Sequence, residues 1–435
     1  MARRRLAWLV LALGPATAQG GNEEAIPLGD DAALTGNTVA AMVSDGSSLF
    51  YNPAGLAGAT RDQIDVGATA TMLRVYSLPD LLKTDDGAAG DGSFTEFVSV
   101  PSAVSYLRTI GPSLRLGFGL FVPASTSWTI DVPLAIDSDT FHLSTTTRQA
   151  IYYGVVGLGW QATPELRLGA SISGIYQSTL GTAVASAGYD RGAAGKQFYS
   201  LAQIFSVTAL GATVAVGAQW EPIPGLHVGL SLRAPTLLIA AAISGSSVEG
   251  SATTGPPSVD FSATDLGSLT LGVHQALPLR ARLGIAWAWG TSWVSIEGDI
   301  QPALDEEAIG ARRVTTWNLR AGGILELAPQ TWLGVGAFTD RSGDPSPESL
   351  INSHIDFYGV TVGVRLDHPH DLAASERAKS VVFSTTLALR YAYGAGDVGG
   401  VVFERMPTTS VPAANSVVDT HVHELGVHLG STVYF

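Results

Sequence analysis

The alternation of apolar with small or polar residues is the feature that most constrains how this 435-residue chain can fold. One stretch has an apolar residue at every second position, namely Leu114, Leu116, Phe118, Leu120 and Val122. The positions between them are held by Arg115, Gly117, Gly119 and Phe121. Because successive side chains of a β-strand point to opposite faces, the pattern predicts strands with one apolar face.

Two classes of protein have strands of this kind, the transmembrane β-barrel and the soluble β-sandwich. The alternating stretches are long for a sandwich, whose strands usually have about five or six residues. Short connections with glycine or proline alternate with long ones, as in barrels with short inner turns and longer outer loops. We expect the long connections at 76–96, 123–147, 179–206, 239–265, 343–353 and 394–419. Together with a chain end, Phe435, that lies directly on a strand, these features predict an all-β transmembrane barrel.

The number of strands depends on how one weak break is interpreted. A first count along the sequence is odd, whereas single-chain bacterial barrels have an even number of antiparallel strands. The weakest break is Gly290-Thr291, because apolar residues continue at every second position through it, so we interpret 279–300 as one strand. The resulting fourteen antiparallel strands are 63–75, 97–108, 114–122, 148–160, 165–178, 207–220, 226–236, 267–276, 279–300, 314–327, 331–340, 354–366, 380–393 and 423–435.

Composition excludes several classes of function. The absence of cysteine rules out disulfide scaffolds, Cys-ligated zinc and thiol nucleophiles. The formal net charge of −14 argues against a nucleic-acid partner. No Gly-x-Ser-x-Gly nucleophile elbow is present, and we expect neither an enzyme nor a cofactor.

Two histidines near the last strand are the best candidates for metal ligands. His421 and His423 would share one face of a strand, so joint binding of a metal ion is geometrically allowed. Solvated histidines are the simpler interpretation, and we assign no metal site.

The first residues resemble a secretory signal peptide. Arg3 to Arg5 form a positive start, Leu6 to Leu13 form an apolar run, and Ala16-Thr17-Ala18 supplies a cleavage pattern. An apolar run this short falls well below the roughly 20 residues that a membrane anchor needs. We therefore expect residues 1–18 to be a cleaved leader of an exported protein.

Residues 19–62 do not alternate and differ from the rest of the chain. Asp30-Asp31, followed by apolar residues at 32–34 and 39–42, predicts a short helix that an aspartate caps. Asn52 before Pro53 predicts a helix start, with asparagine as the N-cap and proline at the first helical position. We therefore divide the mature chain into an N-terminal domain, 19–62, and a barrel, 63–435.

The segment from Asp45 to Gly58 resembles the plug signature of the FadL-type outer-membrane transporters, the family of long-chain fatty-acid and aromatic-hydrocarbon channels. Its Asn-Pro-Ala motif corresponds to Asn52, Pro53 and Ala54. Segments 116–123 and 229–235 are similar to the family's third and seventh strands.

The resemblance implies a fourteen-stranded barrel plugged by a hatch domain, 19–62, in the bacterial outer membrane. Hydrophobic molecules would pass through it passively and leave sideways at a kink in the third strand. Carried over by motif, the gate residues are Asn52, Pro53 and Ala54, which would belong to the part of the hatch that faces this kink in the third strand. The kink residues are Gly117, Gly119 and Pro123. Candidate walls of the hydrophobic passage are Leu49, Phe50 and Phe121.

Each of these roles has a simpler alternative. The apolar residues would then be ordinary packing, the glycines would allow strand curvature, and the whole protein would be a structural or surface-interaction barrel with a permanently closed plug. The expected outer connections are rich in Ala, Gly and Ser, notably at 240–255, and show no apolar groove. The expected partners are a hydrophobic small molecule, outer-membrane lipid and lipopolysaccharide, and the barrel-assembly machinery through Phe435.

Overall fold

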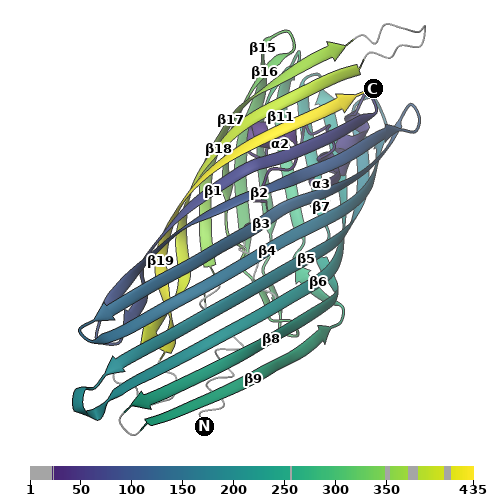
Figure 1. The fold of residues 1–435 in the computed structure, drawn as a ribbon. Helices are drawn as coiled ribbons and strands as arrows, with labels where there is room; N and C mark the ends of the chain where they lie inside the picture. The colour runs from purple at the N-terminus through teal and green to yellow at the C-terminus, as the bar shows by residue number, and fades with distance from the viewer. Residues whose placement is uncertain (1–21, 23, 255–256, 348–352, 371–380, 406–412) are drawn as a thin grey trace.

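The computed structural model describes residues 22, 24–254, 257–347, 353–370, 381–405 and 413–435. The expected leader, 1–18, lies outside these residues. One sheet of seventeen strand segments closes into a barrel, because β1 pairs with both β2 and β19 (Figure 1). The segments are β1 Gln63–Thr84, β2 Ala89–Thr109, β3 Leu114–Ile136, β4 Asp139–Gln161, β5 Leu166–Asp190, β6 Lys196–Ile223, β7 Leu226–Arg233, β8 Thr236–Thr254, β9 Pro257–Leu271, β10 His274–Leu277, β11 Arg280–Trp289, β12 Ser292–Gln301, β15 Thr316–Ala328, β16 Thr331–Asp340, β17 Ser353–His370, β18 Val381–Phe403 and β19 Ala413–Tyr434.

The segments do not divide as the sequence predicted. The expected single strand 279–300 is wrong, because β11 and β12 form a hairpin in which Trp289 lies opposite Ser292. Gly290 takes a positive φ of 60° in the turn between them. The apolar run was misleading because Trp293 faces inward and is buried, whereas Val294 faces outward. The expected strand 267–276 is instead shared between β9 and β10, which run on toward β11.

Several strands are much longer than predicted. The connections expected at 76–96, 123–147, 179–206 and 239–265 are largely extended hairpin arms of β1 to β9. Strand segments of the barrel's outer end do not face lipid, so they need no apolar face, and the alternation of apolar with polar residues stops there. The described pairings are antiparallel except for a short parallel contact in which Leu82–Thr84 of β1 lies beside Val401–Phe403 of β18.

The outward face of the barrel is apolar along the wall. Exposed residues there include Phe118, Leu120, Val156, Leu158, Ile172, Val214, Val216, Leu230, Leu283, Ile285, Leu319, Val360, Val362, Leu387, Leu389, Leu425 and Leu429. Closure of the sheet pairs most strand edges, and the apolar outer face matches the hydrocarbon interior of a bilayer. In the described part of the chain, no helix is both long and apolar enough to cross a membrane.

The wall is tall on one side and short on the other. β6 has 28 residues, whereas β12 and β16 have 10 each. A tilted strand needs about 9–11 residues to cross a bilayer, so β6 continues far beyond the membrane. A small hairpin, β13 Leu304–Glu306 with β14 Ala311–Arg313, connects two strands of the short side.

The N-terminal segment folds inside the barrel at the end where the C-terminus lies (Figure 1). We call residues 24–62 the hatch. It contains helix α2 Asp30–Thr35, helix α3 Ser48–Tyr51 and the 3₁₀ helix η1 Pro53–Gly58. The predicted helix after Asp30-Asp31 is confirmed, although Gly29 and not an aspartate occupies the N-cap. The predicted cap at Asn52 with Pro53 in the first turn is also confirmed.

Candidate functional site

The apolar side of the hatch packs against β3, β4 and β5. The ring of Phe50 lies 5.3 Å from Tyr153 and 6.1 Å from Phe121, measured between ring centroids. The Arg233 guanidinium lies 4.0 Å above the Phe50 ring and donates a 2.6 Å hydrogen bond to the Phe50 carbonyl. Leu49 is buried beside Gly117, where a Cβ atom would approach the leucine within 3.2 Å. The three residues predicted to line a passage therefore lie in one apolar cluster.

The Asn-Pro-Ala motif is held by backbone contacts. Asn52 accepts a 3.2 Å hydrogen bond from the amide of Ala54 and donates a 2.7 Å bond to the carbonyl of Ala40. Its neighbour Pro53 lies so close to β5 that a Cβ atom on Gly169 would be 2.2 Å from the proline carbonyl. The resemblance placed this motif beside the third strand, whereas the structure places it against β5 and β6.

The third strand is irregular at Pro123. Its pairing with β4 shifts register between Phe121 and Ala124, and both Phe121 and Val122 are buried, so the alternation breaks there. Gly117 and Gly119 lie in the regular part of the ladder, opposite Gly157 and Val155. Of the three predicted kink residues, Pro123 alone coincides with the irregularity.

The pairing between β2 and β3 ends at this irregularity. It covers Ala103–Thr109 of β2 and Arg115–Phe121 of β3, and no described pairing continues beyond the Ala103–Phe121 pair. Farther along, Ser127 of β3 donates a 2.7 Å hydrogen bond from its amide to Glu96 of β2. A seam without backbone pairing therefore runs between 97–102 and 122–126.

Ile26 of the hatch fills the inner side of this seam. Its amide donates a 3.1 Å hydrogen bond to the carbonyl of Pro123, and its side chain packs in a cluster with Met72 of β1 and Val98 of β2. Sequence reasoning missed Ile26, because nothing in the sequence around it indicates which strand it meets.

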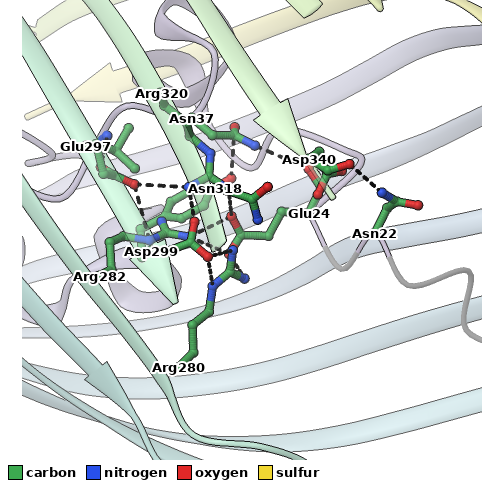
Figure 2. A network of polar contacts seen from close by, with 12 residues as sticks. Asn22, Glu24, Asn37, Arg280, Arg282, Glu297, Asp299, Asn318, Arg320 and Asp340 are labelled. Carbon is green, nitrogen blue, oxygen red and sulfur yellow. Dashed lines mark hydrogen bonds and ion pairs between the residues drawn. The ribbon is translucent and has the colours of Figure 1, made fainter. Parts of the chain in front are cut away.

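The opposite side of the hatch is held by buried ion pairs (Figure 2). Glu24 lies 2.7 Å from both Arg280 and Arg282 of β11, and 3.7 Å from Arg320 of β15. Burial by itself would raise the pKa of Glu24, but the three guanidinium groups lower it to about 2. Glu24 is therefore ionised at neutral pH and ties the N-terminal end of the hatch to the short side of the barrel.

A second acid on β12 fixes the middle of the hatch. Glu297 accepts backbone hydrogen bonds from Val39 at 2.8 Å and Ala40 at 2.6 Å, and pairs with Arg282 at 3.2 Å. Asp299, also on β12, bonds to Arg320. The sequence did not reveal that Glu297 and Arg280 contact the hatch, because each is more than 250 residues from the hatch residue it holds.

Acidic residues of the hatch also face the closing strands of the barrel. Asp30 lies 3.2 Å from His428 of β19, and Asp31 lies 3.1 Å from Arg365 of β17. Asp45 accepts a 2.9 Å hydrogen bond from the amide of Ser47. Burial, and then the neighbouring carboxylates, raise the pKa of Asp45 well above its usual range.

The outer end of the tall side contains an apolar cluster that the sequence did not reveal. Its buried members are Leu78, Leu81, Leu82, Ile130, Val132, Phe141, Leu143, Ala187, Tyr189, Val401, Phe403 and Val418. These residues come from six different strands. The sequence did not reveal the cluster, because the segments that we expected to be outer connections are strands whose apolar residues meet only in the folded barrel. Arg405 joins the strand tips, with Asp137 at 3.4 Å and Asp139 at 3.5 Å.

The remaining residues singled out in the sequence, His421, His423 and Phe435, make hydrogen bonds within the barrel. His421 and His423 face outward and bond to the hydroxyl groups of Tyr393 and Tyr391, at 2.9 Å and 3.0 Å. Within the described residues, no group of three or more His, Asp or Glu side chains is arranged to hold a metal ion. Phe435 donates a 3.0 Å backbone bond to Asp62, and its role in assembly stays a prediction.

The fold and site define a plugged transmembrane barrel of the bacterial outer membrane. Among solved structures, the chain is similar to the toluene transporter TodX of P. putida, with a TM-score of 0.60, 15% identity, and 94% of this chain and 98% of that chain covered. It is similar to a Pseudomonas aeruginosa FadL homologue, with a TM-score of 0.59, 12% identity and coverage of 94% and 98%. The Ralstonia pickettii toluene transporter TbuX gives a TM-score of 0.56, 12% identity and coverage of 95% and 99%.

The chain therefore has the fold of the FadL-type transporters, as its plug signature suggested. No family model matches the chain, and no curated protein matches its sequence. Two of these structural neighbours, TodX and TbuX, are toluene transporters.

Proposed function

We propose that the protein is a passive channel for hydrophobic molecules, which enter the lumen from outside and leave sideways into the membrane through the seam between β2 and β3. The observation that carries the proposal is the end of β2–β3 pairing at Ala103 and Phe121. The resemblance of the fold to hydrocarbon channels supports the same function.

The chemistry of the solute explains why a sideways exit suits it. An apolar molecule gains about 0.8 kcal/mol for each methylene that passes from water to an apolar environment, so an aqueous pore would oppose its transport. On its inner side the seam adjoins an apolar cluster of the hatch, and on its outer side it opens between strands that face lipid. A solute released there would remain in an apolar environment throughout.

Ile26 is the gate in this proposal. It occupies the inner side of the seam through its contact with Val98 and its hydrogen bond to Pro123. Displacement of this short stretch would open the seam without removing the rest of the hatch. Asn52, Pro53 and Ala54 would then serve as the fixed part of the plug, held against β5 and β6.

Uptake of labelled oleate and labelled toluene by cells that lack their own transporter tests the function. Because the chain has no cysteine, a disulfide between Ile26→Cys and Val98→Cys would form without competition. We expect the oxidised pair to lower uptake to the level of empty vector, and a reductant to restore it. Full uptake through the oxidised channel would exclude the seam as the exit.

A control pair separates the seam from general motion of the hatch. Leu34→Cys and Ala388→Cys would tether helix α2 of the hatch to β18 within a different apolar cluster. The oxidised control is expected to keep its uptake, because only the stretch around Ile26 moves in this proposal.

The density of buried ion pairs around Glu24 favours one alternative, a structural or surface-interaction barrel whose plug never opens. In that case the wild-type protein would insert into the membrane and give no uptake of either solute. Correct folding is checked by the resistance of the barrel to unfolding in SDS without heating.

A further inference from the structure

We propose that strand β9 is a docking edge for an extended, basic segment of another protein outside the cell, independently of transport. Among the described residues, β9 has a single strand partner, β8, over its whole length, whereas each of the other long strands of the wall pairs with a strand on both sides over at least part of its length. Figure 1 shows β9 as the outermost strand of its side of the barrel.

The exposure of β9 agrees with a free edge. Every residue from 259 to 265 is exposed, although a wall strand of the barrel normally buries alternate residues. Phe261 is 78% exposed and Val259 is 62% exposed. The Phe261 ring lies over Gly250 of β8, where a Cβ atom would approach it within 2.9 Å.

This surface lies beyond the membrane, so lipid does not explain its apolar residues. The exposed stretch pairs with Ser246–Ala252 of β8. β7 and β8 follow one another along the same edge of β6, and Ser246 is twenty positions beyond Leu226, where β7 begins. A tilted strand needs about 9–11 residues to cross the bilayer. Apolar side chains that are exposed in this way outside the membrane mark interaction sites.

The seam between β2 and β3 shows how the protein covers edges elsewhere. Gly90 and Gly92 of β2 lie against Leu134 and Val132 of β3, with a Cβ atom on Gly92 reaching Val132 at 3.2 Å. Side chains thus close that edge above the opening. An uncovered strand edge presents unpaired N–H and C=O groups to any extended segment that reaches it.

Charge selects the kind of partner. Residues 236–271 contain Glu249, Asp260 and Asp265 and no lysine or arginine. Like charges placed opposite one another destabilise a strand pair, which disfavours a second copy of this chain with its net charge of −14. The edge therefore fits a segment that alternates lysine or arginine with apolar residues.

A labelled synthetic peptide, Lys-Val-Lys-Phe-Lys-Val-Lys, tests the proposal on the full-length barrel in detergent. We expect binding that increases fluorescence polarisation and slows hydrogen exchange of the amides in 258–265. A peptide with proline in place of phenylalanine keeps the charge but cannot extend a sheet, and it is expected to bind at least ten-fold more weakly.

Variants locate the binding on β9. Asp260→Lys and Phe261→Ser are each expected to weaken binding at least five-fold. Glu165→Lys makes the same charge change at an exposed inner turn and is expected to change binding less than two-fold. Three outcomes would overturn the proposal: equal loss in Glu165→Lys, unchanged exchange in β9, or a dimer in sedimentation that Phe261→Ser abolishes, which would assign the edge to a second copy.

Discussion

The two sides of the hatch are held to the barrel by different forces. Toward β3, β4 and β5, Phe50 and Leu49 pack in an apolar cluster. Toward β11, β12 and β15, Glu24 lies among three guanidinium groups and Glu297 binds the hatch backbone. Apolar packing tolerates a side chain of similar volume, whereas a buried ion pair requires both partners. The charged side therefore fixes the hatch in place, and the apolar side permits small displacements.

The proposed gate, Ile26, lies next to the charged side of the hatch in the sequence. Ile26 is two residues from Glu24, so the charged side holds the end of the hatch that closes the seam. An opening that leaves Glu24 bound must pivot around it.

The largest expected effect comes from breaking the charged side. Glu24→Gln removes one of the two buried acids that each of Arg280 and Arg282 contacts, and loss of one partner of such a pair costs about 3–5 kcal/mol. We expect faster hydrogen exchange in 24–40 and higher uptake of toluene, because the end that carries Ile26 is released. Exchange rates equal to those of wild type would show that Glu24 does not anchor the hatch.

A conservative change on the apolar side is expected to cost less. Phe50→Leu keeps an apolar side chain of similar size, so the cost should stay below about 1.5 kcal/mol, apart from the lost contact with Arg233. The measurement is again hydrogen exchange of the hatch, compared with Glu24→Gln in the same detergent. A larger cost for Phe50→Leu than for Glu24→Gln would reverse the comparison.

The smallest expected effect is a pH dependence that distinguishes two hatch acids whose pKa values are shifted in opposite directions, Glu24 and Asp45. The depressed pKa of Glu24 means that its stabilisation is complete above the unfolded value of 4.5 and is lost only as the pH falls toward about 2. The raised pKa of Asp45 has the opposite consequence, because its ionisation opposes folding once the pH rises above the unfolded value of 3.8.

Acidification from pH 7 to pH 5 is therefore expected to leave the Glu24 contacts intact and to stabilise the region around Asp45. Asp45→Asn should stabilise the hatch at pH 7 and flatten this dependence. Protease resistance of the hatch at the two pH values measures it, with Glu165→Gln as a control on the barrel surface. An unchanged pH profile in Asp45→Asn would assign the dependence to other groups.

Short sequence patterns predicted correctly the features that depend on contacts between residues close in the sequence. The cap at Asn52 forms because its acceptor oxygen and the Ala54 amide are two residues apart. Alternation identified the lipid-facing wall, because lipid requires an apolar side chain at every second position. The same pattern failed at Trp293, where a large apolar side chain faces inward, and in the outer strand arms, where no lipid imposes it.

By itself, the sequence determined a barrel with an apolar outer face and a separate N-terminal segment, since period-two alternation and helix caps act over a few residues. Only the tertiary structure decided how the segment is held. Glu24 meets Arg280 and Arg282, Ile26 meets Pro123, and β9 keeps an open edge because closure of the sheet fixes which distant strands face one another. These contacts join residues up to hundreds of positions apart, and no local spacing encodes them.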